Sequence, residues 1–392
     1  MGAAPGAVLK PEQVVGRDEL IADLWSILQS MSVELYSVRR MGKTSVLRKM
    51  AAEPAEGFMV DMADLEGTRS PEEFAKRVFM QVEARLGAGR RVLRHARSLL
   101  SQLDPQEVSG VKLAPGALKE HWKDLVRGVM RDLVEAAEEK KATPVLLWDE
   151  LPLALGDIAK SDPVRAMEVL DLLRELRQTH ASLRMVFSGS VGMHHVLRRL
   201  RGSDYRNEPT NDLYAMVLPP LSLDAAAELA YSLLYKGGVI GGRPEAAAGA
   251  IAEAVDGVPF YVHHVALAMQ LDRSDATPEE AVRHVDALLL DGNDPLQLRH
   301  YRERLNLSYE EGERALALAT LDTVSTELEP CAFGQLRDLV ASRLELTDDE
   351  LLRDVLALLV KDQYLTRDSG GAHSFALGIV KRWWRRDRGL GE

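Results

Sequence analysis

The stretch SVRRMGKT, residues 37–44, fits the phosphate-binding pattern G-x-x-x-x-G-K-[ST] at every fixed position except the first. Gly42 would let the backbone approach a phosphate, Lys43 would reach the outer phosphates, and Thr44 would offer its hydroxyl to Mg²⁺ at the start of a helix. Ser37 replaces the first glycine, and we expect it to make the first turn of the loop less flexible. A Gly-Lys-Thr tripeptide alone is as typical of a helix cap with a solvated lysine, so the flanking sequence decides.

Strand and helix patterns alternate around this loop. A strand is predicted before it at Val33–Tyr36, and a helix after it at Thr44–Ala52. Further apolar runs of strand length lie at Phe58–Met62, Val145–Trp148, Arg184–Phe187 and Ala215–Leu218. Helical patterns lie at Asp18–Gln29, Pro71–Leu86, Leu118–Glu139 and Pro163–Thr179. This alternation predicts an α/β fold with a parallel sheet covered by helices on both faces.

Two acids end the strand predicted at Val145–Trp148. Asp149 and Glu150 would therefore lie at the carboxyl end of a parallel strand, where open α/β sheets bind their ligands. There Asp149 would hold Mg²⁺, and Glu150 would orient or deprotonate an attacking water. The simpler alternative is that the two acids cap the next helix. Combined with the phosphate-binding pattern, the pair predicts a nucleotide site.

Charge and composition limit the possible partners. The formal net charge of -11 disfavours a chain that coats nucleic acid through bulk positive charge. Residues 36–50 are a local exception, because they hold five basic residues and no acid, which suits an anionic ligand. The single cysteine, Cys331, excludes intramolecular disulfides and cysteine-rich zinc sites. With no apolar run near the ~18 residues of a membrane span, and no signal-peptide pattern in Met1–Lys10, we expect a cytoplasmic protein without a membrane partner.

The loop, the acidic strand end and the preceding Val15-Gly16-Arg17 resemble the AAA+-related P-loop ATPases, and among them the archaeal-type group near the origin-recognition-like and STAND ATPases. The resemblance spans roughly residues 14–289. It implies a P-loop NTPase core of the ASCE type with strand order 5-1-4-3-2, then a helical lid and a winged-helix-like domain. The implied cofactors are ATP and Mg²⁺, and the implied reaction is hydrolysis of ATP to ADP and phosphate.

The same resemblance assigns the individual site residues. Ser188 ends a strand where such ATPases place a polar side chain near the γ-phosphate, and Ser190 is the second choice. Lys43, Glu150 and Ser188 would be catalytic, while Thr44 and Asp149 would bind the metal. The residues that would bind the nucleotide are Val15, Gly16, Arg17, Arg40, Met41, Gly42, Lys43, Thr44, Ser45 and Pro259.

The resemblance leaves one role open. AAA+ rings present an arginine to the nucleotide of a neighbouring subunit, and here Arg199 and Arg206 are the first candidates. A basic, solvated helix end is the more frequent explanation for such residues.

We predict four parts: an N-terminal lead (1–13), the ATPase core (14–220), the helical lid (221–295) and the winged-helix-like domain (296–392). The lid would hold helices at Leu223–Leu234, Arg243–Val255, Tyr261–Leu271 and Pro278–Leu289. The last domain would hold helices at Tyr309–Thr323, Ala332–Arg343 and Asp348–Lys361, then strands at Gln363–Arg367 and Ala372–Leu377 around Ser369-Gly370-Gly371. This hairpin is also compatible with an ordinary domain edge.

The function that we expect is an ATP-driven molecular switch that contacts a protein partner and forms a nucleotide-dependent homo-oligomer. One alternative is a DNA-bound assembly factor of the origin-recognition or transposition-regulator kind. Another is a phage-defence or signalling switch that acts through proteins alone. The acidic helix predicted at Asp348–Lys361 is unsuited to reading bases, so DNA would be bound independently of sequence, through basic residues such as Lys381–Arg388.

Three conspicuous pairs have structural explanations. Neighbours on a helix point about 100° apart, so His194-His195 and His263-His264 are unfavourable zinc ligands. We expect Trp383-Trp384 to be a packing anchor, although the basic residues around it leave base stacking open.

Overall fold

The structure is a computed structural model that describes residues 3–7, 9–87, 95–96, 117–344 and 348–391. The chain divides into two compact units. Val8–Leu218 form the first, which we call the sheet unit, and Met1–Ala7 with Pro219–Glu392 form the second, which we call the helical unit. No helix among the described residues has both the length and the apolar character that crossing a bilayer requires.

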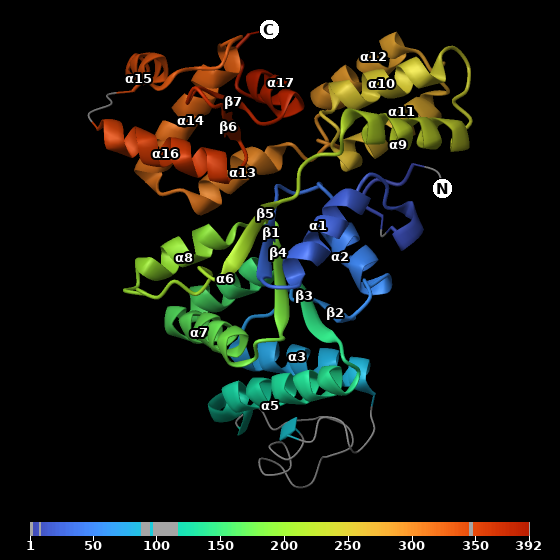
Figure 1. The fold of residues 1–392 in the computed structure, drawn as a ribbon. Helices are drawn as coiled ribbons and strands as arrows, with labels where there is room; N and C mark the ends of the chain where they lie inside the picture. The colour runs from blue at the N-terminus through green and yellow to red at the C-terminus, as the bar shows by residue number, and fades with distance from the viewer. Residues whose placement is uncertain (1–2, 8, 88–94, 97–116, 345–347, 392) are drawn as a thin grey trace. The chain divides into compact units, whose positions relative to one another are not determined.

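A five-stranded parallel sheet forms the centre of the sheet unit (Figure 1). Its order is β2-β3-β4-β1-β5, which is the order expected from the sequence. The strands are β1 (Ser32–Tyr36), β2 (Phe58–Asp64), β3 (Thr143–Asp149), β4 (Arg184–Gly189) and β5 (Leu213–Val217). Because β3, β4 and β1 are neighbours and parallel, their carboxyl ends lie side by side at one edge of the sheet.

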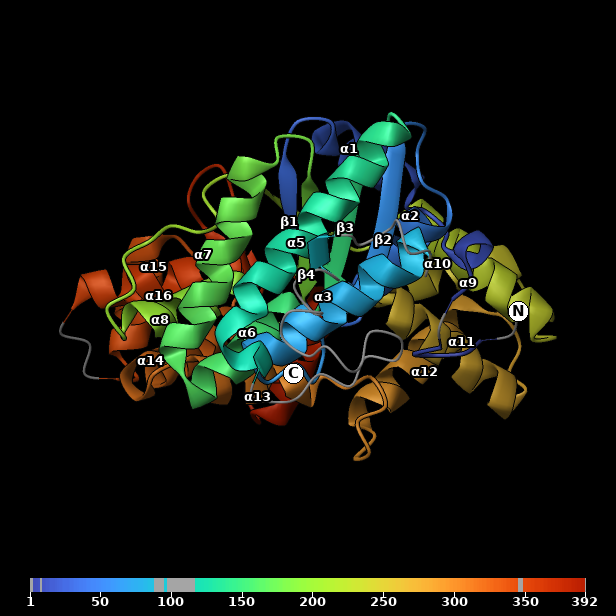
Figure 2. The ribbon, with the colours of Figure 1, turned by 90° about the horizontal axis from the view of Figure 1, so that it is seen from below.

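Helices cover the sheet on both faces. α1 (Asp18–Leu28) and α2 (Lys43–Ala52) cover one face. The larger hydrophobic core lies on the other face, where Figure 2 shows α3 and α5 side by side. The helices of this second group are α3 (Pro71–Leu86), α5 (Ala117–Glu139), α6 (Leu151–Ser161), α7 (Pro163–Thr179) and α8 (Met193–Arg201). The sequence did not predict α6, whose pattern contains Pro152 and Gly156, or α8, whose pattern is crowded with histidines and arginines.

An aromatic stack fixes the strand that carries the two acids. Trp148 is fully buried, stacks on Phe187 of the neighbouring strand at 5.9 Å and meets Phe74 of α3 edge-on at 5.5 Å. Its indole N–H donates to Oε1 of Gln81 at 2.9 Å, which satisfies the buried donor. The residue before Asp149 is therefore held from both sides, and the position of the acidic strand end is well determined.

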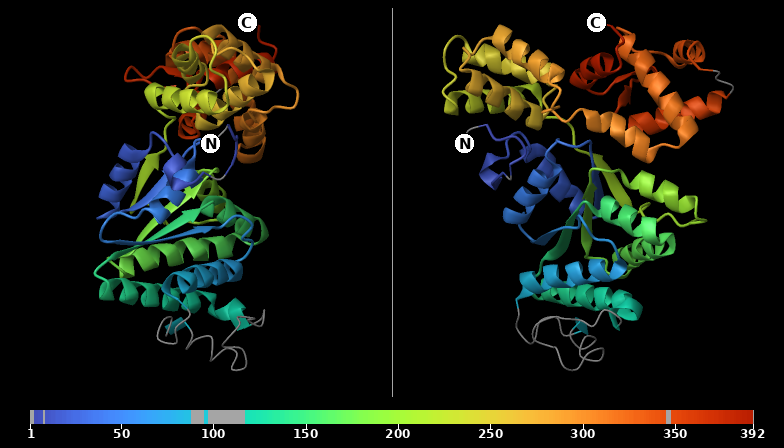
Figure 3. Two further views of the ribbon diagram at one scale, coloured as in Figure 1. Left: turned by 90° about the vertical axis from the view of Figure 1, so that its right-hand side faces the viewer. Right: turned by 180° about the vertical axis from the view of Figure 1, so that it is seen from behind.

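Four helices pack together in the first half of the helical unit (Figure 3). They are α9 (Leu223–Lys236), α10 (Pro244–Ala254), α11 (Pro259–Asp272) and α12 (Pro278–Leu290), and they confirm the four predicted helices within two residues at every end. Prolines begin three of them, since proline costs the first turn of a helix no hydrogen bond.

The second half contains further helices and a two-stranded antiparallel hairpin. These elements are α13 (Arg299–Ser308), α14 (Glu311–Thr326), α15 (Phe333–Ala341), α16 (Asp349–Lys361), β6 (Leu365–Arg367), β7 (His373–Phe375) and α17 (Gly378–Asp387). The three predicted helices and the hairpin are confirmed. The sequence did not predict α13 and α17, because charged residues interrupt their short apolar patterns, or the 3-10 helix η1 (Pro11–Gln13) of the sheet unit, which is only three residues long.

The tryptophan pair is a packing anchor, as expected. Trp383 and Trp384 are both buried in α17, and the indole N–H of Trp384 donates to Oδ1 of Asp322 at 2.8 Å. Arg388 donates to both oxygens of the same carboxylate, at 2.9 and 2.8 Å. Neither indole is available as an exposed stacking platform.

Candidate functional site

The segment 37–42 forms the turn between β1 and α2. Gly42 is the N-cap of α2 with φ +91°, and Arg40 has φ +74°, a region that side chains rarely adopt. Ser37 has no left-handed φ, so glycine would give this position no freedom that the loop uses. That Ser37 makes the turn less flexible stays a prediction, and the backbone conformation that side chains rarely adopt is at Arg40.

The side chain of Lys43 lies inside this loop. Its ammonium donates to the carbonyl oxygens of Ser37 at 2.8 Å and Val38 at 3.2 Å, and lies 3.3 Å from the Ser37 hydroxyl. Lys43 is buried, so its charge is poorly solvated there. An anionic group bound by the loop would meet both this charge and the N-terminus of α2.

Arg17 stabilises the loop through a hydrogen bond to its backbone. It is only 4% exposed, and its Nη2 donates to the carbonyl oxygen of Met41 at 3.0 Å. Burial lowers the pKa of Arg17 to about 10, so the guanidinium keeps its charge at neutral pH. The sequence placed Arg17 near the base of a nucleotide, together with Val15 and Gly16. That contact stays a prediction, and the bracing role was not anticipated.

Thr44 and Asp149 meet directly. The threonine hydroxyl donates to Oδ2 of Asp149 at 2.5 Å, although the two residues come from α2 and β3. Asp149 is 2% exposed, and its Oδ1 accepts the backbone N–H of Glu150 at 3.2 Å. Mg²⁺ prefers oxygen ligands at about 2.0–2.1 Å, which places adjacent ligands about 2.9 Å apart. If the distance between the Thr44 hydroxyl oxygen and Asp149 Oδ2 increased by about 0.4 Å, the two oxygens would be spaced as adjacent ligands of Mg²⁺.

Glu150 is held by a serine at the end of the neighbouring strand. Its Oε2 accepts the backbone N–H of Ser190 at 3.1 Å and the Ser190 hydroxyl at 3.0 Å. Burial is the main cause that raises the pKa of Glu150, and the nearby charge of Asp149 adds to it. Ser190 was the second choice from the sequence. The first choice, Ser188, pairs in register with Leu35 of β1, and its hydroxyl is buried without a hydrogen bond to any described residue. A role of Ser188 near a γ-phosphate stays a prediction.

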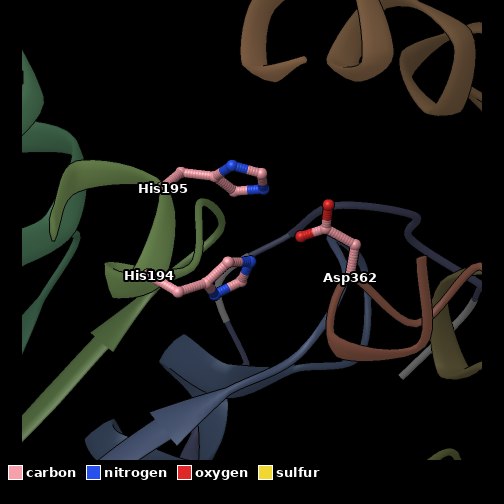
Figure 4. Close-up of side chains that lie close together, drawn as sticks. All are labelled: His194, His195 and Asp362. Atoms are coloured by element: carbon pink, nitrogen blue, oxygen red, sulfur yellow. The ribbon is translucent and has the colours of Figure 1, made fainter. Parts of the chain in front are cut away.

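Pro259 begins α11 in the helical unit, so its contact with a base also stays a prediction. Ser45 lies in the first turn of α2 and is partly exposed. Figure 4 shows the imidazoles of His194 and His195 on α8, with ring centroids 4.3 Å apart. Asp362, drawn with them, belongs to the helical unit, and we assign no metal site to the three residues.

The basic residues around α8 differ in their partners. Arg201 donates to Glu208, and Arg206 donates to Asp204 at 3.0 Å. The side chain of Arg199 is exposed and has no hydrogen bond or ion pair with any residue in the described ranges. Of the two candidates from the sequence, Arg199 is therefore the one whose guanidinium is unengaged.

The basic C-terminal segment is largely bound to its own unit. Lys381 donates to the carbonyl oxygen of Glu327 at 2.5 Å, and Arg382 donates to that of Ala254. Arg386 forms an ion pair with Asp286 at 3.1 Å. These donors would have to give up internal partners to contact phosphates.

No protein-family model and no curated protein matches the sequence. Among solved structures, the chain is similar to the Walker-type ATPase paby2304 of Pyrococcus abyssi, with 17% identity and a TM-score of 0.62 over 95% of this chain and 97% of that one. It also aligns with the Aeropyrum pernix ORC2 protein in its ADP form (12% identity, TM-score 0.46, 95% of each chain) and with Cdc6p from Pyrobaculum aerophilum (13%, 0.40, 98% and 97%). The first likeness confirms the predicted P-loop ATPase fold, and the other two are too weak to carry an argument.

Proposed function

We propose that the chain binds Mg²⁺-ATP, hydrolyses it to ADP and phosphate, and uses the nucleotide state to change a contact with a protein partner. The observation that carries the proposal is the convergence of Lys43, Thr44, Asp149 and Glu150 at the carboxyl ends of β1 and β3. The bond of 2.5 Å between Thr44 and Asp149 ties the two halves of this site together. A loop that merely capped a helix would not require the acidic strand end beside it.

Each site residue has a role in ATP hydrolysis that follows from its chemistry. Lys43 and the backbone N–H groups at the start of α2 stabilise negative charge that develops on the phosphates. Thr44 and Asp149 are suited to hold Mg²⁺, which when bound neutralises phosphate charge and orients the leaving group. Glu150 accepts a proton from the attacking water, while Met41 in the loop and Ser45 in the first turn of α2 contact the nucleotide. The roles of Val15, Gly16, Ser188 and Pro259 in nucleotide binding remain part of this proposal.

In this proposal the helical unit changes the contact with the partner when the nucleotide state changes. We assign residues 221–295 to a lid and 296–392 to a winged-helix-like domain, on the basis of α14, α15 and α16 followed by the β6-β7 hairpin. An exposed, unengaged Arg199 is compatible with a second copy of the chain completing the site, so nucleotide-dependent homo-oligomerisation is part of the proposal. Light scattering of the Glu150→Gln variant with and without ATP tests it, and an unchanged mass would contradict it.

The DNA-bound alternative is less favoured by the charges. The first turn of α16 is acidic and exposed, and Arg353 on this helix is engaged with Glu350 at 3.1 Å and lies over Phe333 at 3.8 Å. Base readout uses unengaged Arg, Lys, Asn or Gln. We expect weak, sequence-independent and steeply salt-sensitive binding of the full chain to a random duplex library. Selection of a defined motif with submicromolar affinity would favour the DNA-recognition function instead.

Nucleotide binding is tested with Lys43→Ala against Lys49→Ala. Both changes remove a lysine from α2, but Lys49 forms an ion pair with Asp18 at 2.8 Å, whereas Lys43 donates to carbonyl oxygens of the loop. In calorimetric titrations, Lys43→Ala should lose ATP affinity by at least about 100-fold, because it removes two to three charge-assisted hydrogen bonds from the lysine ammonium to the phosphates. The affinity of Lys49→Ala should stay near that of wild type. Circular dichroism checks that both fold. Wild-type affinity for ATP in a folded Lys43→Ala variant would contradict the proposed nucleotide site.

Hydrolysis is tested separately with Glu150→Gln. The variant should bind Mg²⁺-ATP as wild type does and turn over at least about 100-fold more slowly, since a positioned general base is typically worth 10²–10⁴-fold. If Glu150→Gln hydrolyses ATP at the wild-type rate, Glu150 only caps α6 and the base is elsewhere.

A further inference from the structure

Glu150 occupies an unfavourable backbone conformation. It precedes α6 with φ +56°, in the left-handed region that costs a residue with a side chain about 1–2 kcal/mol. Such conformations persist only where surrounding contacts determine them, and they cluster at functional sites. The contacts of the Glu150 side chain therefore bear on what stabilises this backbone conformation.

Both hydrogen bonds to the Glu150 carboxylate come from Ser190, and both reach the same oxygen. The backbone N–H is 3.1 Å and the hydroxyl 3.0 Å from Oε2. Oε1 has no hydrogen-bond partner among the described residues. One carboxylate oxygen is thus fixed by two donors, and the other is left to accept a proton.

The close approach of β4 to α6 makes these bonds possible. Gly189 lies against Pro152 in the first turn of α6, and a Cβ on Gly189 would come within 2.8 Å of Pro152 Cδ and 3.0 Å of its Cγ. A side chain at residue 189 would push the helix away from the strand end. Glycine at this position therefore brings Ser190 within hydrogen-bond distance of the residue that begins α6.

We propose that Ser190 is a positioning residue that fixes Glu150 through Oε2 and leaves Oε1 to act as the base. The inference rests on the proposed ATPase activity. Ser190 touches neither the phosphates nor the metal in this role: it acts only through Glu150. A flexible glutamate would spend much of its time in other rotamers, and each such rotamer is unproductive because proton transfer requires a base within hydrogen-bond reach.

Steady-state kinetics of Ser190→Ala and Ser190→Thr test the role. Alanine keeps the backbone donor and removes the hydroxyl, so we expect kcat to fall about tenfold, the lower end for one hydrogen bond to a charged group, with KM for ATP within twofold of wild type. Threonine retains the hydroxyl and should restore most of the loss. Ser203→Ala, which alters an exposed serine beyond α8, is the matched control and should leave kcat unchanged.

The combination with Glu150→Gln distinguishes positioning from a general structural effect. If Ser190 acts only through Glu150, Ser190→Ala should lower kcat no further in the Glu150→Gln background, because the two changes remove the same function. A tenfold additional loss there would overturn the inference. So would an unchanged or increased kcat in Ser190→Ala alone, since an increase would mean that Ser190 holds the base away from its task.

The two proposals fail in different ways. If wild type hydrolyses ATP and Glu150→Gln does not, the function stands, and only the Ser190 variants decide the inference. If wild type does not hydrolyse ATP at all, the proposed function itself fails. A melting temperature of Ser190→Ala within about 3 °C of the wild-type value would show that a lower kcat is not caused by partial unfolding.

Discussion

Asp256 provides a cap for a helix far away in the sequence, and its removal should loosen that helix. It follows α10, and its Oδ2 accepts the backbone N–H of Ile379 at 2.6 Å, while the N–H of Gly378 donates to the same carboxylate. These are the first residues of α17, whose own N-cap residue, Leu377, contributes no side-chain bond. Burial raises the pKa of Asp256, and the two backbone donors partly oppose this effect.

The expected cost of Asp256→Ala is about 3 kcal/mol. Two hydrogen bonds to a charged acceptor are worth about 1.5–3 kcal/mol each, reduced here because the carboxylate keeps some access to water. A further loss of about 1 kcal/mol comes from alanine at φ +50°, a conformation that aspartate tolerates better. Asp256→Asn keeps the shape and the tolerance for this φ, so it should cost about half as much.

Hydrogen exchange of the α17 amides measures this loss locally. Since every 1.4 kcal/mol is a factor of ten, exchange in α17 should accelerate about 100-fold in Asp256→Ala and about tenfold in Asp256→Asn. Helix α7 of the sheet unit is the internal control and should exchange at the wild-type rate. If α17 exchanges within threefold of wild type in Asp256→Ala, the cap does not hold this helix and the reasoning is refuted.

Three further predictions follow from the sheet unit. Arg40→Gly should be more stable than Arg40→Ala by about 0.5–1 kcal/mol in urea unfolding, because both remove the side chain but only glycine tolerates φ +74°; equal stabilities would show that the loop is unstrained. Burial raises the pKa of Asp61 to about 6, and its Oδ2 is buried without a hydrogen-bond partner among the described residues. The folded state therefore binds this proton more tightly than the unfolded state, and the stability present below about pH 4 is lost as pH rises through 6. Asp61→Asn should raise the melting temperature at pH 7.5 but not at pH 4, and an equal change at both would contradict this origin. Arg17→Met should weaken ATP binding about tenfold, measured by calorimetry, because the Met41 carbonyl loses its buried donor; unchanged affinity would show that the loop needs no brace.

The local sequence determined most of the sheet unit. Apolar runs of strand length separated by amphipathic helices are properties of neighbouring residues, so the parallel sheet and both halves of the site could be predicted from residues 37–44 and the strand ending at Asp149. The strand order came from the resemblance to a known family, because pairing of strands far apart in the chain leaves no local pattern. The helices α6 and α8 were missed because Pro152 and Gly156 in α6, and the polar and basic residues of α8, obscure the helical pattern.

The tertiary structure decided which side chains meet. Sequence reasoning preferred Ser188 to Ser190, but Ser188 pairs with β1 inside the sheet and its hydroxyl is buried without a hydrogen bond to any described residue, whereas Ser190 lies just beyond the strand end and donates to Glu150. Arg17 donates to a carbonyl of the loop, and acids or carbonyls of the helical unit occupy Lys381, Arg382, Arg386 and Arg388. Hydrogen bonds and ion pairs depend on distance and direction between elements. The sequence therefore determined which groups this protein carries, and only the packing of its elements decided which of them act together.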